Sequence, residues 1–324
     1  MARMENIVKR LAPELEAMNG IIADSLHTPN RMMNGIVDHY LEVKGKQIRP
    51  MLVILAAKMF GRVSDEVLYA GASLEMLHNA SLIHDDIVDE TFLRRGRDTI
   101  NASWGNHIAV LVGDYFVSNA LSVGLRSGSV KVVSALCALG QELSLGEIDQ
   151  ITTAREHSFD TDSYFTVIRQ KTASLFCSCV NVGLDVSHAP EQYVAPMGRY
   201  AELLGLCFQI KDDIFDYFPN PQIGKPTGND LREGKVTLPL LYALRNAPQD
   251  ESNRMKDLIR RGDLTTAEIE SLVEFAKAHG GIDDAFAKMR QMQKEADEII
   301  APLPDSESKE SFREIFDYII SRDR

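Results

Sequence analysis

No proline occurs between Met51 and Ala189, and across this stretch apolar residues recur about every 3.6 positions. Proline breaks helices, and an apolar repeat of this period forms one buried helix face, so the stretch can be helical throughout. Strand-like alternation of apolar and polar residues is rare there. The sequence therefore predicts an all-α fold, with helices at residues 3–25, 30–43, 47–59, 64–90, 105–126, 128–152, 160–184, 192–218, 235–246, 251–261, 265–279, 281–301 and 306–321.

Length and composition allow one large domain or two ordinary ones. The chain has 324 residues, 44% of them hydrophobic, which is enough to bury a large core. Beyond Pro248 the predicted helices are shorter and more charged, with breaks at Gly262, Gly280 and Pro302. We expect a single domain over residues 1–324, with residues 249–324 as a peripheral helical layer.

Charge and cysteine content exclude several classes of protein. The net charge of -12 and the pI near 5.2 argue against nucleic acid as a partner, because no basic excess exists to displace phosphate counterions. No uninterrupted apolar run approaches the roughly 18 residues that span a bilayer. We expect a cytoplasmic protein with no stable membrane anchor. Its four cysteines, expected to be buried in a reduced compartment, are Cys137, Cys177, Cys179 and Cys207.

Two distant segments carry the same acidic pattern, Asp-Asp-x-x-Asp. We call Asp85-Asp86-x-x-Asp89 the first motif and Asp212-Asp213-x-x-Asp216 the second motif. Residues four apart share a helix face, so the outer two aspartates of each motif can act together, while the middle aspartate lies about 100° round the helix. One such motif is equally typical of a solvated acidic face. Two of them, both flanked by apolar residues, favour metal sites, because carboxylates at a core margin repel each other unless a cation neutralises them.

The ligand types suggest the metal and its third partner. Carboxylate oxygens without cysteine favour Mg²⁺, or Mn²⁺, over zinc, and Mg²⁺ commonly completes its shell with phosphate oxygens. Basic side chains at loop positions could hold a diphosphate. Taken singly, each is more typical of an ordinary surface cation, and their placement beside the acidic motifs is what favours ligand binding. His78 shares the face of Asp85 and is equally typical of a core histidine. The basic candidates are Lys46, Arg49, Arg94, Arg95, Lys171, Lys225 and Lys235.

A di-iron bundle is the competing metal site. Glu75 and His78 have the Glu-x-x-His spacing of ferritin-like di-iron proteins, which are also all-helical. Such sites need a second Glu-x-x-His, and the sequence contains none. The alternative also leaves the two acidic motifs and the basic loops unexplained.

In kind and order these motifs resemble the all-trans polyprenyl diphosphate synthases, and they are most similar to bacterial long-chain, octaprenyl-type members. The resemblance covers nearly the whole chain. Its parts are Gly45 through Pro50, His78 through Asp89, Arg94-Arg95-Gly96, Gly146-Glu147, Lys171-Thr172, Phe208 through Asp216, Gly224-Lys225 and Gly228 through Pro239.

The resemblance implies an architecture and a set of ligands. The fold would be a helical bundle of the isoprenoid synthase type around a central cavity, with the two motifs facing each other across its mouth, in a homodimer. The substrates would be isopentenyl diphosphate and an allylic diphosphate, such as farnesyl diphosphate. Mg²⁺ would be held by Asp85, Asp89 and Asp212, with Asp86, Asp213 and Asp216 in supporting roles.

The resemblance also assigns the remaining site residues. Arg94, Lys171 and Lys235 would contact the allylic diphosphate, and Lys225 belongs to the same substrate-binding set. Isopentenyl diphosphate would lie on Lys46, Arg49, His78 and Arg95. Thr172 and Gln209 would lie near the developing carbocation. The residues expected to carry catalysis are Asp85, Asp89, Lys171, Asp212 and Lys235.

The implied reaction is an ionisation, a condensation and a proton elimination. Loss of diphosphate from the allylic carbon leaves a carbocation, which the double bond of isopentenyl diphosphate attacks. In this family bulky residues just before the first motif limit product length, and here those positions are Ala80 and Ser81. Small residues there favour a medium- or long-chain product, although they are equally consistent with simple packing. Deeper candidates for the cavity floor are Leu77, Met76, Leu139 and Leu143.

Three other functions stay open. The chain could be a non-catalytic partner subunit of a heteromeric synthase, a short-chain farnesyl or geranylgeranyl synthase, or an ionisation-type terpene cyclase. Intact acidic and basic motifs argue against the first, and the second Asp-Asp-x-x-Asp argues against the last. The closing residues Arg322-Asp323-Arg324 resemble a basic tail of long-chain members and are expected near the isopentenyl site.

Overall fold

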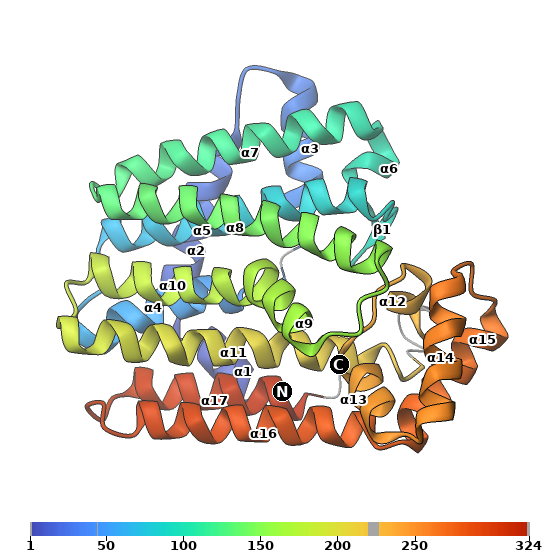
Figure 1. Ribbon diagram of the computed structural model, residues 1–324. Helices are drawn as coiled ribbons and strands as arrows, with labels where there is room; N and C mark the ends of the chain where they lie inside the picture. The colour runs from blue at the N-terminus through green and yellow to red at the C-terminus, as the bar shows by residue number, and fades with distance from the viewer. Residues whose placement is uncertain (1, 44, 220–226, 323–324) are drawn as a thin grey trace. The chain divides into compact units, whose positions relative to one another are not determined.

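The computed structural model describes residues 2–43, 45–219 and 227–322. It is almost entirely helical, which confirms the predicted all-α class (Figure 1). The longer helices are α1 (Ala2–Arg10), α2 (Ala12–Leu26), α3 (Arg31–Leu41), α4 (Ile48–Phe60), α5 (Asp65–Val88), α7 (Asn106–Arg126), α8 (Val130–Arg155), α9 (Thr161–Ile168), α10 (Ser174–Val186), α11 (Val194–Phe215), α13 (Leu238–Asn246), α14 (Gln249–Arg261), α15 (Thr266–Ala278), α16 (Gly281–Ile300) and α17 (Glu307–Ser321).

Local capping explains where several helices begin. The Asn30 side chain accepts the N–H groups of Met32 and Met33 and starts α3. Thr265 and Glu268 form a reciprocal capping box at the start of α15. Such contacts satisfy backbone donors that have no partner inside the helix. The first residues of these two helices are therefore set by short polar capping motifs in the sequence.

The structure differs from the predicted helices in a few places. The segment predicted at 3–25 divides at Leu11 into α1 and α2, because Pro13 occupies the first turn of α2, where a missing N–H costs least. The segment predicted at 160–184 contains a π-helical turn, η1 (Arg169–Ala173). Short elements that were not predicted are the hairpin strands β1 (Leu93–Arg94) and β2 (Arg97–Asp98), the helices α6 (Ile100–Trp104) and α12 (Asn229–Arg232), and the 3₁₀ turn η2 (Glu191–Tyr193).

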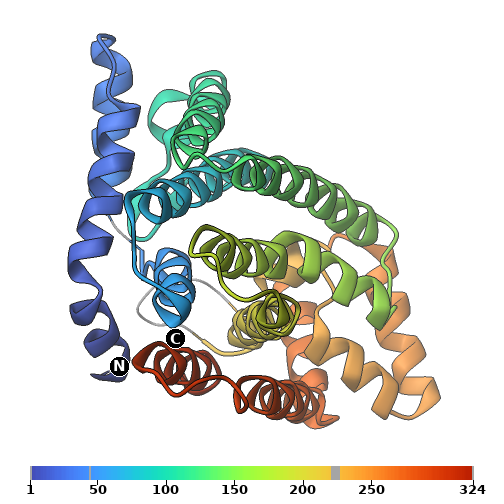
Figure 2. The same cartoon turned by 90° about the vertical axis from the view of Figure 1, so that its left-hand side faces the viewer.

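The chain divides into two compact units, and the first comprises residues 1–141, 175–199 and 303–315. Within it α5 and α7 lie side by side (Figure 1), and α2 packs on both α4 and α5 (Figure 2). The side chains of α4 are almost all buried, as expected for an element at the centre of a bundle. Helix α7 is long and apolar enough to span a membrane by length and composition alone, and 39% of that window is buried.

The second unit comprises residues 142–174, 200–302 and 316–324. Its core includes the apolar face of α11, with Leu203, Leu204, Ile210 and Ile214 buried, and α13 packs on α15 and α16. Residues 249–302 belong to this unit and residues 303–315 to the first. The single domain with a peripheral layer over 249–324 stays a prediction.

Candidate active site

The first motif lies where α5 ends, in the first unit. Its middle aspartate, Asp86, is buried, while Asp85 and Asp89 are partly exposed. Arg94, on strand β1, donates a hydrogen bond from Nε to Asp86 Oδ1 at 2.8 Å, and its Nη2 forms an ion pair with the same oxygen at 2.7 Å. Asn101 adds a hydrogen bond to the Asp86 carbonyl at 3.1 Å. The hairpin after the motif thus returns an arginine to the motif's own middle carboxylate.

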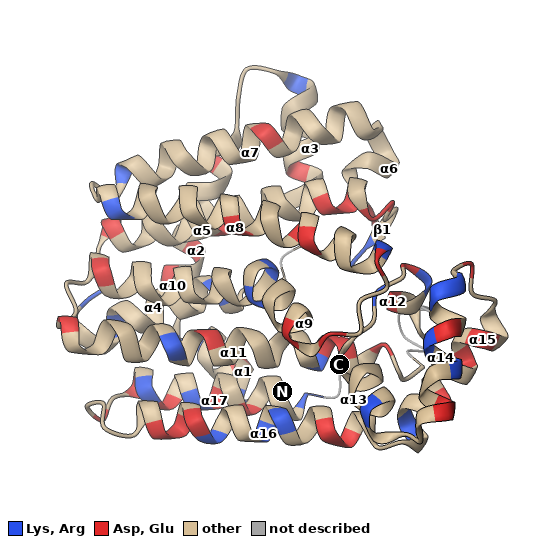
Figure 3. Cartoon of the chain, in the orientation of Figure 1, with Lys and Arg blue, Asp and Glu red and all other residues tan. Residues whose placement is uncertain are grey.

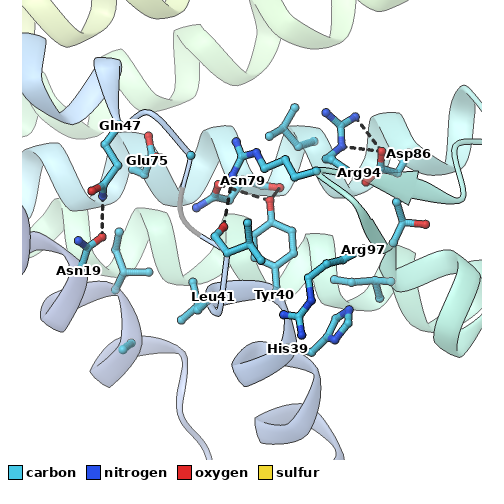
Figure 4. Close-up of a pocket in the computed structure, with 18 of the residues that line it drawn as sticks. Asn19, His39, Tyr40, Leu41, Gln47, Glu75, Asn79, Asp86, Arg94 and Arg97 are labelled. Carbon is cyan, nitrogen blue, oxygen red and sulfur yellow. Dashed lines mark hydrogen bonds and ion pairs between the residues drawn. The ribbon is translucent and has the colours of Figure 1, made fainter. Parts of the chain in front are cut away.

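A cavity of about 430 Å³ opens beside this ion pair (Figure 4). Its lining includes Asp86, Arg94 and Arg95, together with Tyr40, whose hydroxyl donates to Asn79 at 3.4 Å. Arg94 and Arg95 were predicted from sequence, and the structure brings both to this cavity. Among the described residues that line it, Lys46, Arg49 and His78 do not occur.

His78 lies in a strongly positive environment. It is buried, and burial lowers the pKa of its imidazole well below the usual value, helped by Arg49, Arg95 and Arg94. The ring is therefore neutral at neutral pH, and three arginine charges surround it. Arg95 also donates to the Val43 carbonyl at 3.4 Å. The charges of Arg49 and Arg95 also act on the Glu75 carboxyl, and Arg94 is paired with Asp86, so an anion bound here would share these arginines with two carboxyl groups.

The proposed chain-length positions lie on α5 just before the motif. Ala80 is fully buried and Leu77 is 6% exposed, whereas Ser81 is partly exposed and donates to the His78 carbonyl at 2.9 Å. Met76 and Leu139 are also buried, and Leu143 is partly exposed. Burial is what packing alone would require, so the roles of these residues stay predictions.

The second motif lies at the end of α11, in the second unit. Arg322 donates to Asp212 Oδ1 at 2.5 Å and to the Phe208 carbonyl at 3.2 Å. Its guanidinium lies over the rings of Phe208 and Phe215, 4.4 and 5.3 Å from their centroids. Arg322 was expected near isopentenyl diphosphate, and the structure places it against an aspartate of the second motif. Asp323, Arg324 and Lys225 lie outside the described residues.

Asp213, the middle aspartate, is held by neutral donors. Tyr164 donates to its Oδ2 at 2.6 Å and Gln209 to its Oδ1 at 2.8 Å, while Thr172 donates to Gln209 at 2.7 Å. Burial raises the pKa of the Asp213 carboxyl to about 6, although both hydrogen bonds act to lower it. Ionisation of Asp213 is therefore less favourable than that of a carboxyl group in water.

Asp216 accepts hydrogen bonds from the backbone of a later segment. Its carboxylate accepts the backbone N–H groups of Asn229 and Asp230, at 2.9 and 3.0 Å, where α12 begins. Burial raises the pKa of Asp216 and raises that of Asp230 well above its usual value, with the charges of Asp213 and Asp216 adding to the effect at Asp230. Asp230 was not assigned a role from sequence. The signal was its place in the Gly228 to Pro239 segment.

A second cavity, of about 190 Å³, collects most of the predicted residues of this unit. Lys171, Thr172, Gln209, Asp213 and Lys235 all line it. Lys171 pairs with Glu147, and Lys235 pairs with Glu233 at 2.6 Å. Asp230 also lines the cavity, as do Tyr164 and Gln150, which were missed from sequence because nothing local marks them.

Within the described part of the chain, no three His, Cys, Asp or Glu side chains converge on a ready-made metal site. In the second motif the carboxylates turn to protein donors instead: Arg322, the pair Tyr164 and Gln209, and backbone N–H groups. The donor chemistry still fits a hard divalent cation, because every candidate ligand is a carboxylate oxygen. Burial first, and then neighbouring carboxylates, raise the pKa values of Asp213 and Asp216, and a bound cation would oppose both effects. Figure 3 shows acidic residues at the end of α5 beside the β1 hairpin. The face-to-face arrangement of the two motifs stays a prediction.

Comparison with known proteins gives a consistent result. The family model described as polyprenyl synthetase matches residues 30–276. Octaprenyl diphosphate synthase of Escherichia coli is 32% identical over 99% of each chain. A polyprenyl synthase structure from Caulobacter crescentus, complexed with calcium and isoprenyl diphosphate, has a TM-score of 0.91 at 28% identity and covers 98% of each chain. A geranylgeranyl pyrophosphate synthase structure from Bacteroides thetaiotaomicron has a TM-score of 0.85 at 35% identity, over 99% of this chain and 100% of that one.

Proposed function

The chain belongs to the polyprenyl synthetase family, and on that premise we propose that it condenses isopentenyl diphosphate head-to-tail with an allylic prenyl diphosphate. The observation that carries this proposal is the cavity of the second unit, where Lys171 and Lys235 lie with Thr172, Gln209 and Asp213. Cations beside carboxylates are what a metal-bound diphosphate requires. The reaction needs no nucleophilic side chain.

Lys171 and Lys235 would bind the allylic diphosphate and offset the negative charge that grows as it leaves. Each ammonium begins in an ion pair, with Glu147 and Glu233 respectively. On substrate binding, each ammonium would exchange its carboxylate partner for a phosphate oxygen. Neither ammonium therefore has to be unpaired before the substrate binds. Such preorganised cations cost little rearrangement when the C–O bond breaks.

Thr172 and Gln209 would lie beside the carbon that becomes cationic. The two side chains are hydrogen-bonded to each other at 2.7 Å, and Gln209 is hydrogen-bonded to Asp213. Their oxygen dipoles can stabilise positive charge, while the hydrogen bonds restrain them from attacking it. Exclusion of water by the surrounding side chains would protect the same cation.

Isopentenyl diphosphate would be held by the basic residues of the first unit: Lys46, Arg49 and Arg95. Neutral His78, with its pKa lowered by burial and by the nearby arginines, can donate one hydrogen bond without adding charge. This leaves the arginines to bind the diphosphate, and the apolar end of the substrate free to react.

We propose Mg²⁺ as the metal, with Asp85, Asp89 and Asp212 as ligands and Asp86, Asp213 and Asp216 in support. When bound, it would neutralise the diphosphate and make it a better leaving group. The calcium and isoprenyl diphosphate in the Caulobacter crescentus structure support a divalent cation in this family.

The proposed product is a medium- or long-chain all-trans polyprenyl diphosphate, made from a primer such as farnesyl diphosphate. The E. coli octaprenyl relative and the small, buried Ala80 support it, while the Bacteroides structure represents a shorter product. Ala80→Phe should shorten the product by at least one isoprene unit, because the new ring enters a fully buried position. An unchanged product ladder by chromatography, from a variant with unchanged unfolding midpoint, would contradict the role of Ala80.

The function itself is tested with the purified chain, isopentenyl diphosphate, farnesyl diphosphate and Mg²⁺, followed by chromatography of the products. We expect elongation that stops when a chelator removes the metal and resumes when Mg²⁺ is restored. No elongation by the pure, folded chain would overturn the proposal and favour a partner-subunit role.

We further propose a homodimer. Helix α7 exposes Val110, Leu111 and Leu125, at 42%, 61% and 67%, while a different set of its residues, including Phe116 and Val123, is buried in the first unit. A second copy covering these side chains would bury apolar surface that water otherwise meets. Sedimentation velocity should show twice the mass of the chain, and a monomer at micromolar concentration would argue against this assembly.

A further inference from the structure

The π-helical turn η1 carries Lys171 and Thr172 between α9 and α10. The N–H of Ser174 donates to the carbonyl of Arg169, five residues back, so the hydrogen-bonded loop holds one residue more than in an α-helix. Turns of this kind are uncommon and frequently lie at functional sites. The orientation of Lys171 therefore depends on what holds this turn in place.

Helix α8 holds one side of the turn by close approach. A Cβ atom at Gly146 would lie 2.9 Å from the Cβ of Gln170 and 3.0 Å from the backbone N of Lys171. Any side chain at position 146 would force the helix and the turn apart. The next residue, Glu147, pairs with Lys171. The absence of a side chain at Gly146 thus brings this carboxylate within reach.

Helix α11 holds the other side through a chain of hydrogen bonds. Thr172 in the turn donates to Gln209, and Gln209 donates to Asp213, at 2.7 and 2.8 Å. Tyr164 on α9, before the turn, donates to the second oxygen of Asp213 at 2.6 Å. Tyr164 is only 9% exposed, and Asp213 is 5% exposed. The same carboxylate therefore connects a residue before the turn with a residue inside it.

We propose that Tyr164 is a positioning residue for the condensation, acting through Asp213 and Gln209 on Thr172 and hence on the turn that presents Lys171. The proposal rests on the proposed function, since it gives the network a purpose in binding the allylic diphosphate. Tyr164 need not touch the substrate. With its hydroxyl removed, Asp213 keeps one donor only, and the hydrogen-bonded path from α9 to the turn is broken.

The test compares Tyr164→Phe with Tyr115→Phe. Both remove one hydroxyl, but Tyr115 donates to the Leu26 carbonyl in the first unit, at 3.1 Å. We expect Tyr164→Phe to raise both the KM for the allylic diphosphate and the Kd for inorganic diphosphate with Mg²⁺ by about tenfold, the loss typical of a hydrogen bond to a charged group. Tyr115→Phe should change neither, while both variants unfold at similar urea concentrations.

A double-mutant cycle with Thr172→Val then tests the path. If the hydroxyl acts through Gln209 on Thr172, the double variant should bind diphosphate about as weakly as the weaker single variant. Full multiplication of the two effects, or equal binding by Tyr164→Phe and Tyr115→Phe, would overturn the positioning role. These outcomes are read in a wild type that elongates its substrate; a wild type that does not elongate rejects the proposed function, and the diphosphate binding cycle still reports on the network.

Discussion

Asp86 and Asp213 occupy the same place in two copies of one motif, yet their surroundings differ. Asp86 receives a hydrogen bond and an ion pair from an arginine, whereas Asp213 receives one hydrogen bond each from a tyrosine and a glutamine. The first carboxylate is neutralised by a full charge, while the second has only neutral donors and a pKa raised to about 6 by burial. Identical motifs can therefore carry different electrostatic states, because the partners come from elsewhere in the chain.

The neutralising arginine of the second motif pairs with a different position. Arg322 contacts Asp212, the first aspartate, whereas Arg94 contacts Asp86, the middle one. Arg94 follows its aspartate by eight residues, and Arg322 follows by 110. The first motif thus carries its own counterion in a nearby hairpin, and the second motif depends on a residue of α17's continuation.

The largest expected effect comes from removing the charge that supports Asp86. Arg94→Gln leaves a buried carboxylate without its cation, so the free energy of unfolding should fall by about 3 kcal/mol, measured by urea denaturation. Adding Asp86→Asn to the same chain should restore much of that loss, because the uncompensated charge disappears. A double variant no more stable than Arg94→Gln would show that Asp86 does not depend on the arginine's charge.

The second motif should show the opposite behaviour. The folded-state pKa of Asp213, about 6, lies above its usual value of 3.8, so the folded protein holds the proton more tightly and this group's contribution to stability falls as pH rises from about 4 to 6. Asp213→Asn removes that dependence. In metal-free buffer, the free energy of unfolding of the variant should therefore rise relative to that of the wild type, by up to about 3 kcal/mol at pH 7. Urea denaturation of both proteins at several pH values measures this difference. Free energies of unfolding that change with pH in the same way in the two proteins would contradict the prediction.

The smallest expected effect concerns Arg322 and the metal. Arg322→Gln removes a positive charge next to Asp212. The affinity of the protein for Mn²⁺ should then rise by about fivefold, because the guanidinium no longer repels the cation. Electron paramagnetic resonance of free Mn²⁺ measures the change. Arg313→Gln is the matched control, because Arg313 lies on α17 and pairs weakly with Glu310 at 3.7 Å. Equal affinities in the two variants would mean that Arg322 only anchors the chain.

Periodicity and proline spacing predicted most of the fold. The helices that carry both motifs were placed within a few residues, since α5 and α11 have continuous apolar faces and clear ends. The π-helical turn was missed because it changes the hydrogen-bond pattern without changing the apolar repeat. The hairpin at Leu93 to Asp98 was treated as loop, although Arg95 and Gly96 both take positive φ, as a two-residue hairpin turn requires.

The candidate site, like the fold, was predicted only in part. Residue type pointed to Arg94, Lys171 and Lys235, and the family resemblance assigned them roles and added Thr172 and Gln209; the structure brings each of these to a cavity. The contacts of Tyr164 with Asp213 and of Arg322 with Asp212 were not predictable. They join residues 49 and 110 positions apart, and a tyrosine in an apolar helix face carries no local sign that its hydroxyl has a buried partner.

The hydrogen bonds of Asp216 offer a way to detect a cation bound at the second motif. Its two oxygens are the acceptors for the N–H groups of Asn229 and Asp230. A cation that took these oxygens would leave both amides without an acceptor, and they would exchange with solvent faster. Hydrogen exchange at two backbone positions thus becomes a gauge of whether Asp216 is a ligand or remains a helix cap, independent of any substrate.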